Sequence, residues 1–175
     1  MATSQNGWPV LLTGSAQLHT FVIPATTGVF KIRLRGGSAG FILAHFLLWF
    51  AEVIEPVAGK TLDDWGHAVR SIRGQTTGYS NHASGTAFDV NSLKHPLGVR
   101  GTFRRWQYAK MRARLVLYRG CIRLGIDYQN RPDEMHGEIN KPLATCERVA
   151  RMLMSTPRGK RLLAANPGQK AVILS

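Results

Sequence analysis

Two histidines and an aspartate have the types and spacing that suit a catalytic zinc site. His82 and Asp89 stand seven residues apart, and His136 follows much later in the chain. Imidazole nitrogens and carboxylate oxygens are donors that zinc takes, and catalytic zinc keeps a fourth position for water. Residues seven apart in a strand face opposite ways, so the chain must bend between His82 and Asp89, and Gly85 is where a bend costs least. We expect these three side chains to bind one Zn²⁺ ion.

The first element that must position these donors is a strand at residues 86–90. Alternation along a strand places Ala87 and Asp89 on the metal face. Phe88 and Val90 then point to the core, and the small Ala87 leaves room for a substrate.

A second alternating run, at residues 134–139, carries the other histidine. Met135 and Ile139 face one way in this run, and His136 and Glu138 face the other. Two strands are therefore predicted to direct their polar residues at one place.

The combined pattern, Ser-x-His-x-x-Gly-x-Ala-x-Asp followed by a carboxylate-x-x-His, resembles a known family. This is the family of zinc D-alanyl-D-alanine carboxypeptidases and L-alanyl-D-glutamate peptidases, which includes vancomycin-resistance dipeptidases and many phage endolysins. The fixed positions are filled here by Ser80, His82, Gly85, Ala87, Asp89, Asp133 and His136. The stretches His95-Pro96-Leu97-Gly98 and 127–136 are similar to lysins of actinobacterial phages. The resemblance covers about residues 20–142.

Three further residues are substrate-binding candidates. Arg70 fits the family's position for a guanidinium that holds a peptide carbonyl or a terminal carboxylate and stabilises the oxyanion, and Arg73 is close enough to be that residue instead. Ser80 either hydrogen-bonds the substrate or shapes the turn before His82. The sequence departs from the family at Gly137, where related lysins tend to have an aromatic residue, and this puts substrate fit or ligand rigidity in question.

Two neighbouring carboxylates compete for the role of general base. If the second strand begins at Glu134, then Glu134 shares a face with His136 and lies beside the metal. The family instead places its acid/base carboxylate three residues before the histidine, which is Asp133. A turn around Pro132 would take Asp133 out of strand geometry and over the open zinc position. We favour Asp133 and keep Glu134 as the alternative.

Length, charge and cysteine content limit the possible functions but do not identify one. The chain has 175 residues, enough for a single domain with a real core, and 44% of them are hydrophobic. A formal charge of +13 predicts attraction to a polyanion such as nucleic acid, anionic lipid or cell-wall phosphate. Two cysteines without a C-x-x-C spacing predict buried, reduced thiols. We expect neither a signal peptide nor a membrane span.

The remaining pattern predicts an α+β domain over residues 1–175. We expect a small antiparallel sheet that carries the zinc site in an open cleft, with helices packed on its other face. The expected elements are a hairpin within 21–34, a buried helix at 39–57, a helix at 103–119, strands at 122–128 and 134–139, a helix at 142–154 and a basic tail at 157–175.

The expected function is hydrolysis of a stem-peptide bond in bacterial peptidoglycan, either L-alanyl-D-glutamate or D-alanyl-D-alanine. The expected role is that of a phage endolysin, held in the host cytoplasm until a separate hole-forming protein releases it. Its basic surface would attract anionic wall polymers, with no specific nucleic acid and no insertion into membrane. The rival is a catalytically silent basic binding protein, for cell wall or nucleic acid, with structural zinc. Structural zinc usually has four protein ligands rich in cysteine, which favours the enzyme.

Overall fold

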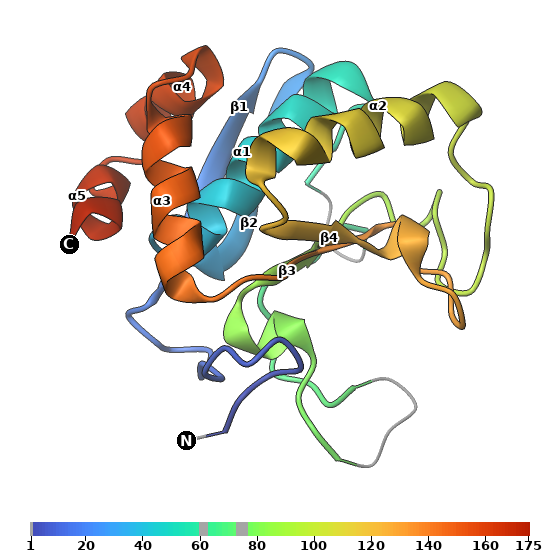
Figure 1. The fold of residues 1–175 in the computed structure, drawn as a ribbon, viewed down its shortest axis with the longest axis horizontal. Helices are drawn as coiled ribbons and strands as arrows, with labels where there is room; N and C mark the ends of the chain where they lie inside the picture. Colours follow the sequence, from blue (N-terminus) through green and yellow to red (C-terminus); the bar gives the residue numbers. More distant parts are fainter. Residues whose placement is uncertain (1, 60–62, 73–76) are drawn as a thin grey trace.

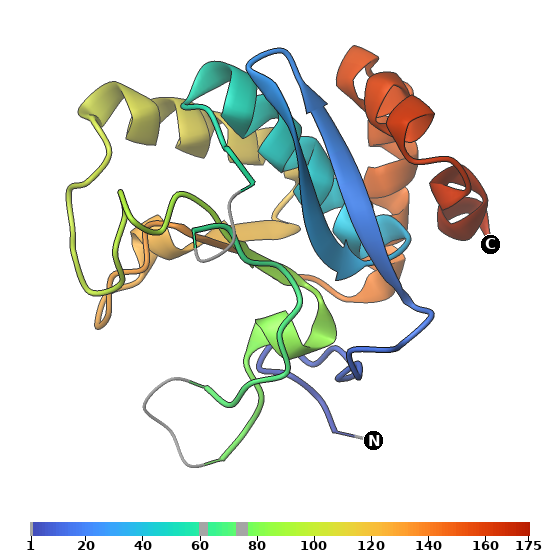
Figure 2. The ribbon, with the colours of Figure 1, turned by 180° about the vertical axis from the view of Figure 1, so that it is seen from behind.

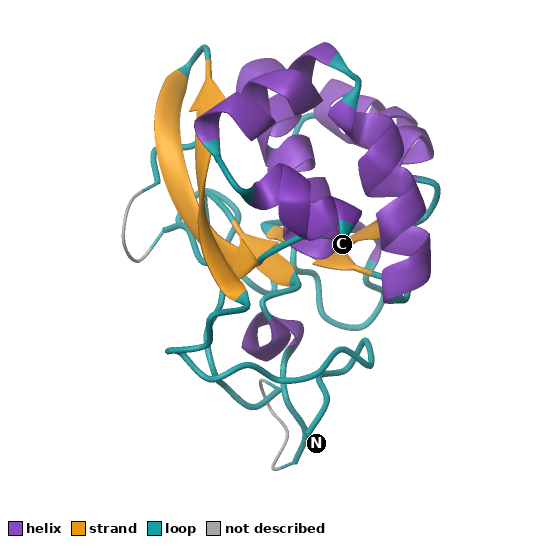
Figure 3. Cartoon of the chain, turned by 90° about the vertical axis from the view of Figure 1, so that its left-hand side faces the viewer, coloured by secondary structure: helices purple, strands orange, loops and turns teal. Residues whose placement is uncertain are grey.

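The computed structural model describes residues 2–59, 63–72 and 77–175. It is an α+β fold with two small antiparallel sheets, as the sequence predicts (Figure 1). Helices gather at one end of the molecule, and the N-terminal segment and long loops gather at the other (Figure 3). Among the described residues, no helix is both long and apolar enough to cross a bilayer.

A hairpin of β1 (Leu18–Ala25) and β2 (Gly28–Arg35) forms the first sheet. Ala25 pairs with Gly28 across a two-residue turn. Alternate side chains such as Phe21 and Ile23 are fully buried, as a half-buried sheet requires. Figure 2 shows this hairpin lying along the central helix.

The central helix is α1 (Ser38–Val53), which is buried along almost its whole length. A helix that is apolar on all sides is stable only inside a core, and here the hairpin, α3 and α4 surround it. It ends four residues before the predicted Val57. The residue before a proline avoids helical geometry, and Glu55 precedes Pro56.

The second sheet carries the candidate site and has the order β3 (Ala87–Asp89), β5 (His136–Ile139), β4 (Ile122–Leu124). Asp89 pairs directly with His136 in the antiparallel register. On the opposite face, the Phe88 ring stacks on Phe46 of α1 with centroids 6.0 Å apart. Helix packing on one face therefore leaves the other face of the sheet for polar residues.

Three strands are shorter than the sequence predicts. Strand β3 covers Ala87–Asp89 of the expected 86–90, and β4 and β5 are shortened where they approach each other's ends. After Leu124 the chain turns into a 3₁₀ helix at Gly125–Asp127, and β5 begins at His136 instead of Glu134. The cause is a close approach, because a Cβ at Gly125 would overlap the carbonyl of Asp133. The N–H of Asp133 also donates to the Gly125 carbonyl at 3.4 Å. Residues 133–135 therefore cross the end of β4 and do not pair with it.

Helix α2 (Arg105–Leu115) continues into a 3₁₀ turn at Val116–Tyr118. Its Trp106 is 44% exposed. The Lys110 ammonium lies 5.3 Å from the centre of its ring, a cation–π arrangement that an exposed indole can make. Met111 is the apolar residue of α2 that is buried in the core.

The last third of the chain forms α3 (Leu143–Met154), α4 (Pro157–Ala165) and α5 (Gln169–Leu174). The predicted basic tail is thus helical and packs against α1 and α3. Thr156 caps α4 by accepting the Gly159 N–H at 3.0 Å. The two cysteines, Cys121 and Cys146, are free and buried.

Candidate metal centre and active site

His82, Asp89 and His136 converge in one buried cluster. One donor atom from each lies within 4.8 Å of the others. His136 Nδ1 is 2.8 Å and His82 Nε2 is 3.3 Å from the same oxygen, Oδ1 of Asp89. The three residues are at most 8% exposed. The structure therefore brings together the three residues that the sequence proposes as ligands.

A short 3₁₀ helix at Asn81–Ser84 positions His82. The Ser80 hydroxyl accepts the His82 N–H at 3.3 Å, and Gly85 ends the turn at φ 68°. A left-handed φ favours glycine, so the predicted bend falls where the sequence places it. His82 Nδ1 lies 2.6 Å from the Gly66 carbonyl and must donate to it. Its Nε2 lone pair is then left to face Asp89.

His136 is held from behind by a second carboxylate. Its Nε2 lies 3.0 Å from Oε2 of Glu138, and the same oxygen accepts from Asn81 Nδ2 at 2.6 Å. Burial disfavours charge on His136, but its hydrogen bonds to Asp89 and Glu138 outweigh burial and raise its pKa to about 10. The pocket around His136 therefore attracts positive charge.

Asp89 supplies negative charge to the same place. Burial alone would raise its pKa, but its interactions with His82 and His136 outweigh burial and hold the pKa well below its usual range. An Arg70 guanidinium nitrogen lies 3.2 Å from the other oxygen, Oδ2. Asp89 is thus ionised and oriented toward the two imidazoles.

This donor set fits a divalent metal ion. A tetrahedral ion with bonds of about 2.1 Å separates its ligand atoms by about 3.4 Å, close to the spacing between His82 and Asp89. His82 Nε2 is buried and makes no hydrogen bond with any residue that the structure describes. The Glu138–His136 pair repeats the carboxylate–histidine arrangement that orients metal-binding imidazoles.

The cluster opens into a cavity of about 320 Å³. Asp133 is half-buried and lines this cavity. Glu134 does not line it, since its carboxylate accepts hydrogen bonds from Gly101, Thr102 and Tyr108 on the other side of the segment. Because β5 begins at His136, the condition under which Glu134 would share a face with His136 is not met.

The substrate-binding candidates lie as follows. Arg70 lines the cavity, and its side chain is 31% exposed. Arg73 lies outside the described residues. Ser80 makes the turn-shaping contact with His82 and also lines the cavity, so both predicted roles are compatible with its position.

Gly137, where the sequence departs from the family pattern, lies against the Phe88 ring. It pairs with Phe88 across the sheet, and a Cβ at position 137 would overlap the Phe88 ring. An aromatic side chain from the adjacent strand therefore packs against this position. The strand that carries His136 keeps a tightly packed inner face.

The remaining histidines make other contacts. His19 lies 3.2 Å from Asn166, His67 lies 2.9 Å from the Leu11 carbonyl, and His45 contacts Tyr118 and Thr156 inside the core. His95 is buried and does not line the cavity.

Sequence reasoning missed the residues that support the cluster. Asn6 donates its backbone N–H to Oδ1 of Asn81 at 2.9 Å, and Asn81 in turn holds Glu138. Gln5 and Asn6 also form part of the cavity wall. The period-two pattern had placed Glu138 on the face of His136, which was a usable signal. No sequence pattern indicated the role of Asn6, because its partners are distant in sequence.

Residues 73–139 match the family model described as D-alanyl-D-alanine carboxypeptidase. The match covers less than half of the chain but includes the whole His–Asp–His cluster and Asp133. It supports a peptidase of this family with a peptidoglycan-derived peptide as substrate. Comparison with curated proteins and with solved structures gives no match.

Proposed function

We propose that this protein is a zinc-dependent peptidase that hydrolyses a stem-peptide bond of bacterial peptidoglycan, L-alanyl-D-glutamate or D-alanyl-D-alanine, as a phage endolysin. The observation that carries the proposal is the buried His82–Asp89–His136 cluster at the floor of a cavity that Asp133 also lines. The family match over the same segment supports it. The similarity to actinobacterial phage lysins supports the lytic role.

The residues of this chain would have the following roles in hydrolysis. A zinc ion bound by the three donors supplies Lewis acidity and brings the pKa of water toward neutrality. Asp133 accepts the proton of the attacking water and delivers it to the leaving amine. Arg70, held by Asp89, directs its guanidinium at the carbonyl oxygen as charge develops there. Glu138 would accept the Nε2 hydrogen of His136, which leaves the Nδ1 lone pair free to bind the metal ion.

The test is hydrolysis of purified peptidoglycan, followed by counting of new amino termini. We expect activity with zinc, loss of activity with a chelator, and recovery when zinc is added back. His82→Ala should be inactive under all three conditions. Undiminished hydrolysis in the presence of the chelator would contradict the zinc-dependent mechanism. No new termini, together with tight and salt-sensitive binding of DNA, would favour the rival binding protein.

A further inference from the structure

Glu134 adjoins the proposed base, yet its side chain serves a different part of the molecule. It is 5% exposed, and its two oxygens accept from Gly101 N–H at 2.8 Å and Thr102 N–H at 2.9 Å. The Thr102 and Tyr108 hydroxyls donate to the same carboxylate. The Glu134 carboxylate therefore binds the consecutive backbone amides of one loop.

That loop, residues 96–102, forms part of the cavity wall. Leu97 lines the cavity. Gly98 N–H donates to the Pro132 carbonyl at 2.8 Å, and the Arg100 guanidinium donates to the carbonyls of Tyr128 and Gln129. All these contacts join the loop to residues 128–134, which lead into β5. Among these contacts, the hydrogen bonds to Glu134 are the ones that involve a buried carboxylate.

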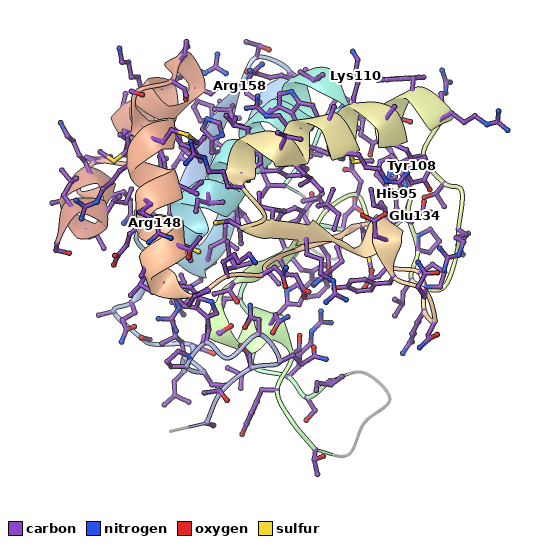
Figure 4. The ribbon with its side chains drawn as sticks, in the orientation of Figure 1. His95, Tyr108, Lys110, Glu134, Arg148 and Arg158 are labelled. Atoms are coloured by element: carbon purple, nitrogen blue, oxygen red, sulfur yellow. The ribbon has the colours of Figure 1, made fainter. Side chains whose placement is uncertain are left out.

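The base of the loop is anchored deeper in the core. His95 is buried and contacts Glu55 at 2.8 Å through Nε2 and the Thr102 hydroxyl at 2.7 Å through Nδ1. Its ring stacks on Phe103 with centroids 3.7 Å apart. Figure 4 shows His95, Tyr108 and Glu134 near one another beside α2. The network thus runs from the end of α1 through the loop to the residue beside Asp133.

We propose that Glu134 is a positioning residue, which latches the 96–102 loop so that Leu97 forms a substrate-binding wall of the active-site cavity. This inference rests on the proposed peptidase function. Glu134 acts on the substrate through the loop and takes no part in proton transfer. A carboxylate suits the task because one group receives two adjacent N–H donors, and hydrogen bonds to a charged acceptor are the stronger kind.

The first measurement needs no activity. Amide hydrogen exchange should show Gly101 and Thr102 protected in the zinc-loaded protein and exposed by Glu134→Gln, which replaces one acceptor oxygen with a donor. Glu147→Gln on α3 is the matched control and should leave both amides protected. Unchanged protection in Glu134→Gln would overturn the latch whether or not the protein is a peptidase.

The second measurement is steady-state hydrolysis of a soluble stem peptide. Glu134→Gln should raise KM about tenfold or more with kcat changed less than about threefold, because the wall is lost and the chemistry is not. Leu97→Ala should raise KM similarly, and the double variant should be little worse than either single one. Additive effects on KM would contradict action through Leu97. A kcat loss of about a hundredfold with KM unchanged would make Glu134 itself the base.

If Glu134→Gln does not fold, Thr102→Val tests the same latch with one donor removed and both backbone amides kept. It should raise KM by a smaller factor than the loss of the carboxylate, and a wild-type KM would count against the latch. Absence of hydrolysis by the wild type would instead refute the proposed function, and the exchange measurement would still decide the latch.

Discussion

At the scale of single residues, the choice between two adjacent carboxylates follows from where their oxygens lie. Asp133 lines the cavity and Glu134 is bound by Gly101, Thr102 and Tyr108. We expect Asp133→Asn to lower kcat about a hundredfold or more, since a general base contributes on that order. Zinc content, measured by atomic absorption, should stay at the wild-type level. Near-normal turnover in Asp133→Asn would exclude it as the base.

Glu138 allows a prediction about metal affinity that is separate from catalysis. It holds His136 Nε2 at 3.0 Å and is itself held by Asn81. Glu138→Gln keeps an acceptor but removes the charge, so the zinc Kd should rise about ten- to a hundredfold. Calorimetric titration of the metal-free protein measures it, with Glu147→Gln as the control. Equal affinity in the two variants would show that Glu138 does not tune the site.

At the scale of elements, the N-terminal segment is part of the active-site wall although it lies far from the motifs in sequence. The Asn6 side chain donates to the Thr86 hydroxyl and to the Ile139 carbonyl, both at 2.8 Å. Asn6→Ala should lower the free energy of unfolding by about 1–3 kcal/mol, because buried acceptors lose their donor. Urea unfolding measures the change. The Gln5 side chain makes no such bonds within the described chain, so Gln5→Ala should be near neutral, and equal losses would argue against this role of Asn6.

His45 couples the packing of helices to pH. It is fully buried in α1 and contacts Tyr118 and the α4 cap residue Thr156. Burial, with the nearby charges of Arg114 and Arg158, lowers its pKa from 6.5 to about 3. Below pH 6.5, His45 is therefore protonated in the unfolded chain but stays neutral in the folded protein. This contribution to stability is complete above pH 6.5 and is lost as pH falls toward 3.

The expected loss from His45 between pH 7.5 and pH 5 is about 2 kcal/mol of unfolding free energy. Urea unfolding at the two pH values should show the loss in the wild type and a smaller one in His45→Gln, at equal zinc content. Equal losses in both proteins would mean that other groups carry the acid sensitivity.

At the scale of the whole molecule, the sequence predicted the features that depend on residues close together in the chain. The bend at Gly85, the strand faces of Asp89 and His136 and the buried α1 all follow from local pattern. The start of β5 did not, because it depends on Asp133 crossing Gly125. The groups that hold the proposed ligands in place could not be predicted either. The Gly66 carbonyl is a backbone group that no residue type identifies, and Asn6 meets its partners only in the folded protein.

The net charge of +13 belongs to the whole surface and not to the site. Exposed basic residues lie on four helices, among them Lys110 on α2 and Arg148 on α3 (Figure 4). Arg158 on α4, in contrast, pairs with Glu52. Such dispersed charge attracts a polyanion without a specific pocket. We therefore expect wall affinity to be electrostatic and distributed.

Binding to purified cell walls should then weaken steeply as salt rises, because exposed charges are screened beyond about 8 Å at physiological ionic strength and beyond about 3 Å at 1 M. Co-sedimentation of the zinc-loaded protein with walls at increasing sodium chloride measures this. Lys110→Gln combined with Arg148→Gln should weaken binding at low salt and leave hydrolysis of a small soluble peptide unchanged, since neither residue lines the cavity. Wall binding that salt does not weaken would show that a specific pocket, and not the surface charge, holds the polymer.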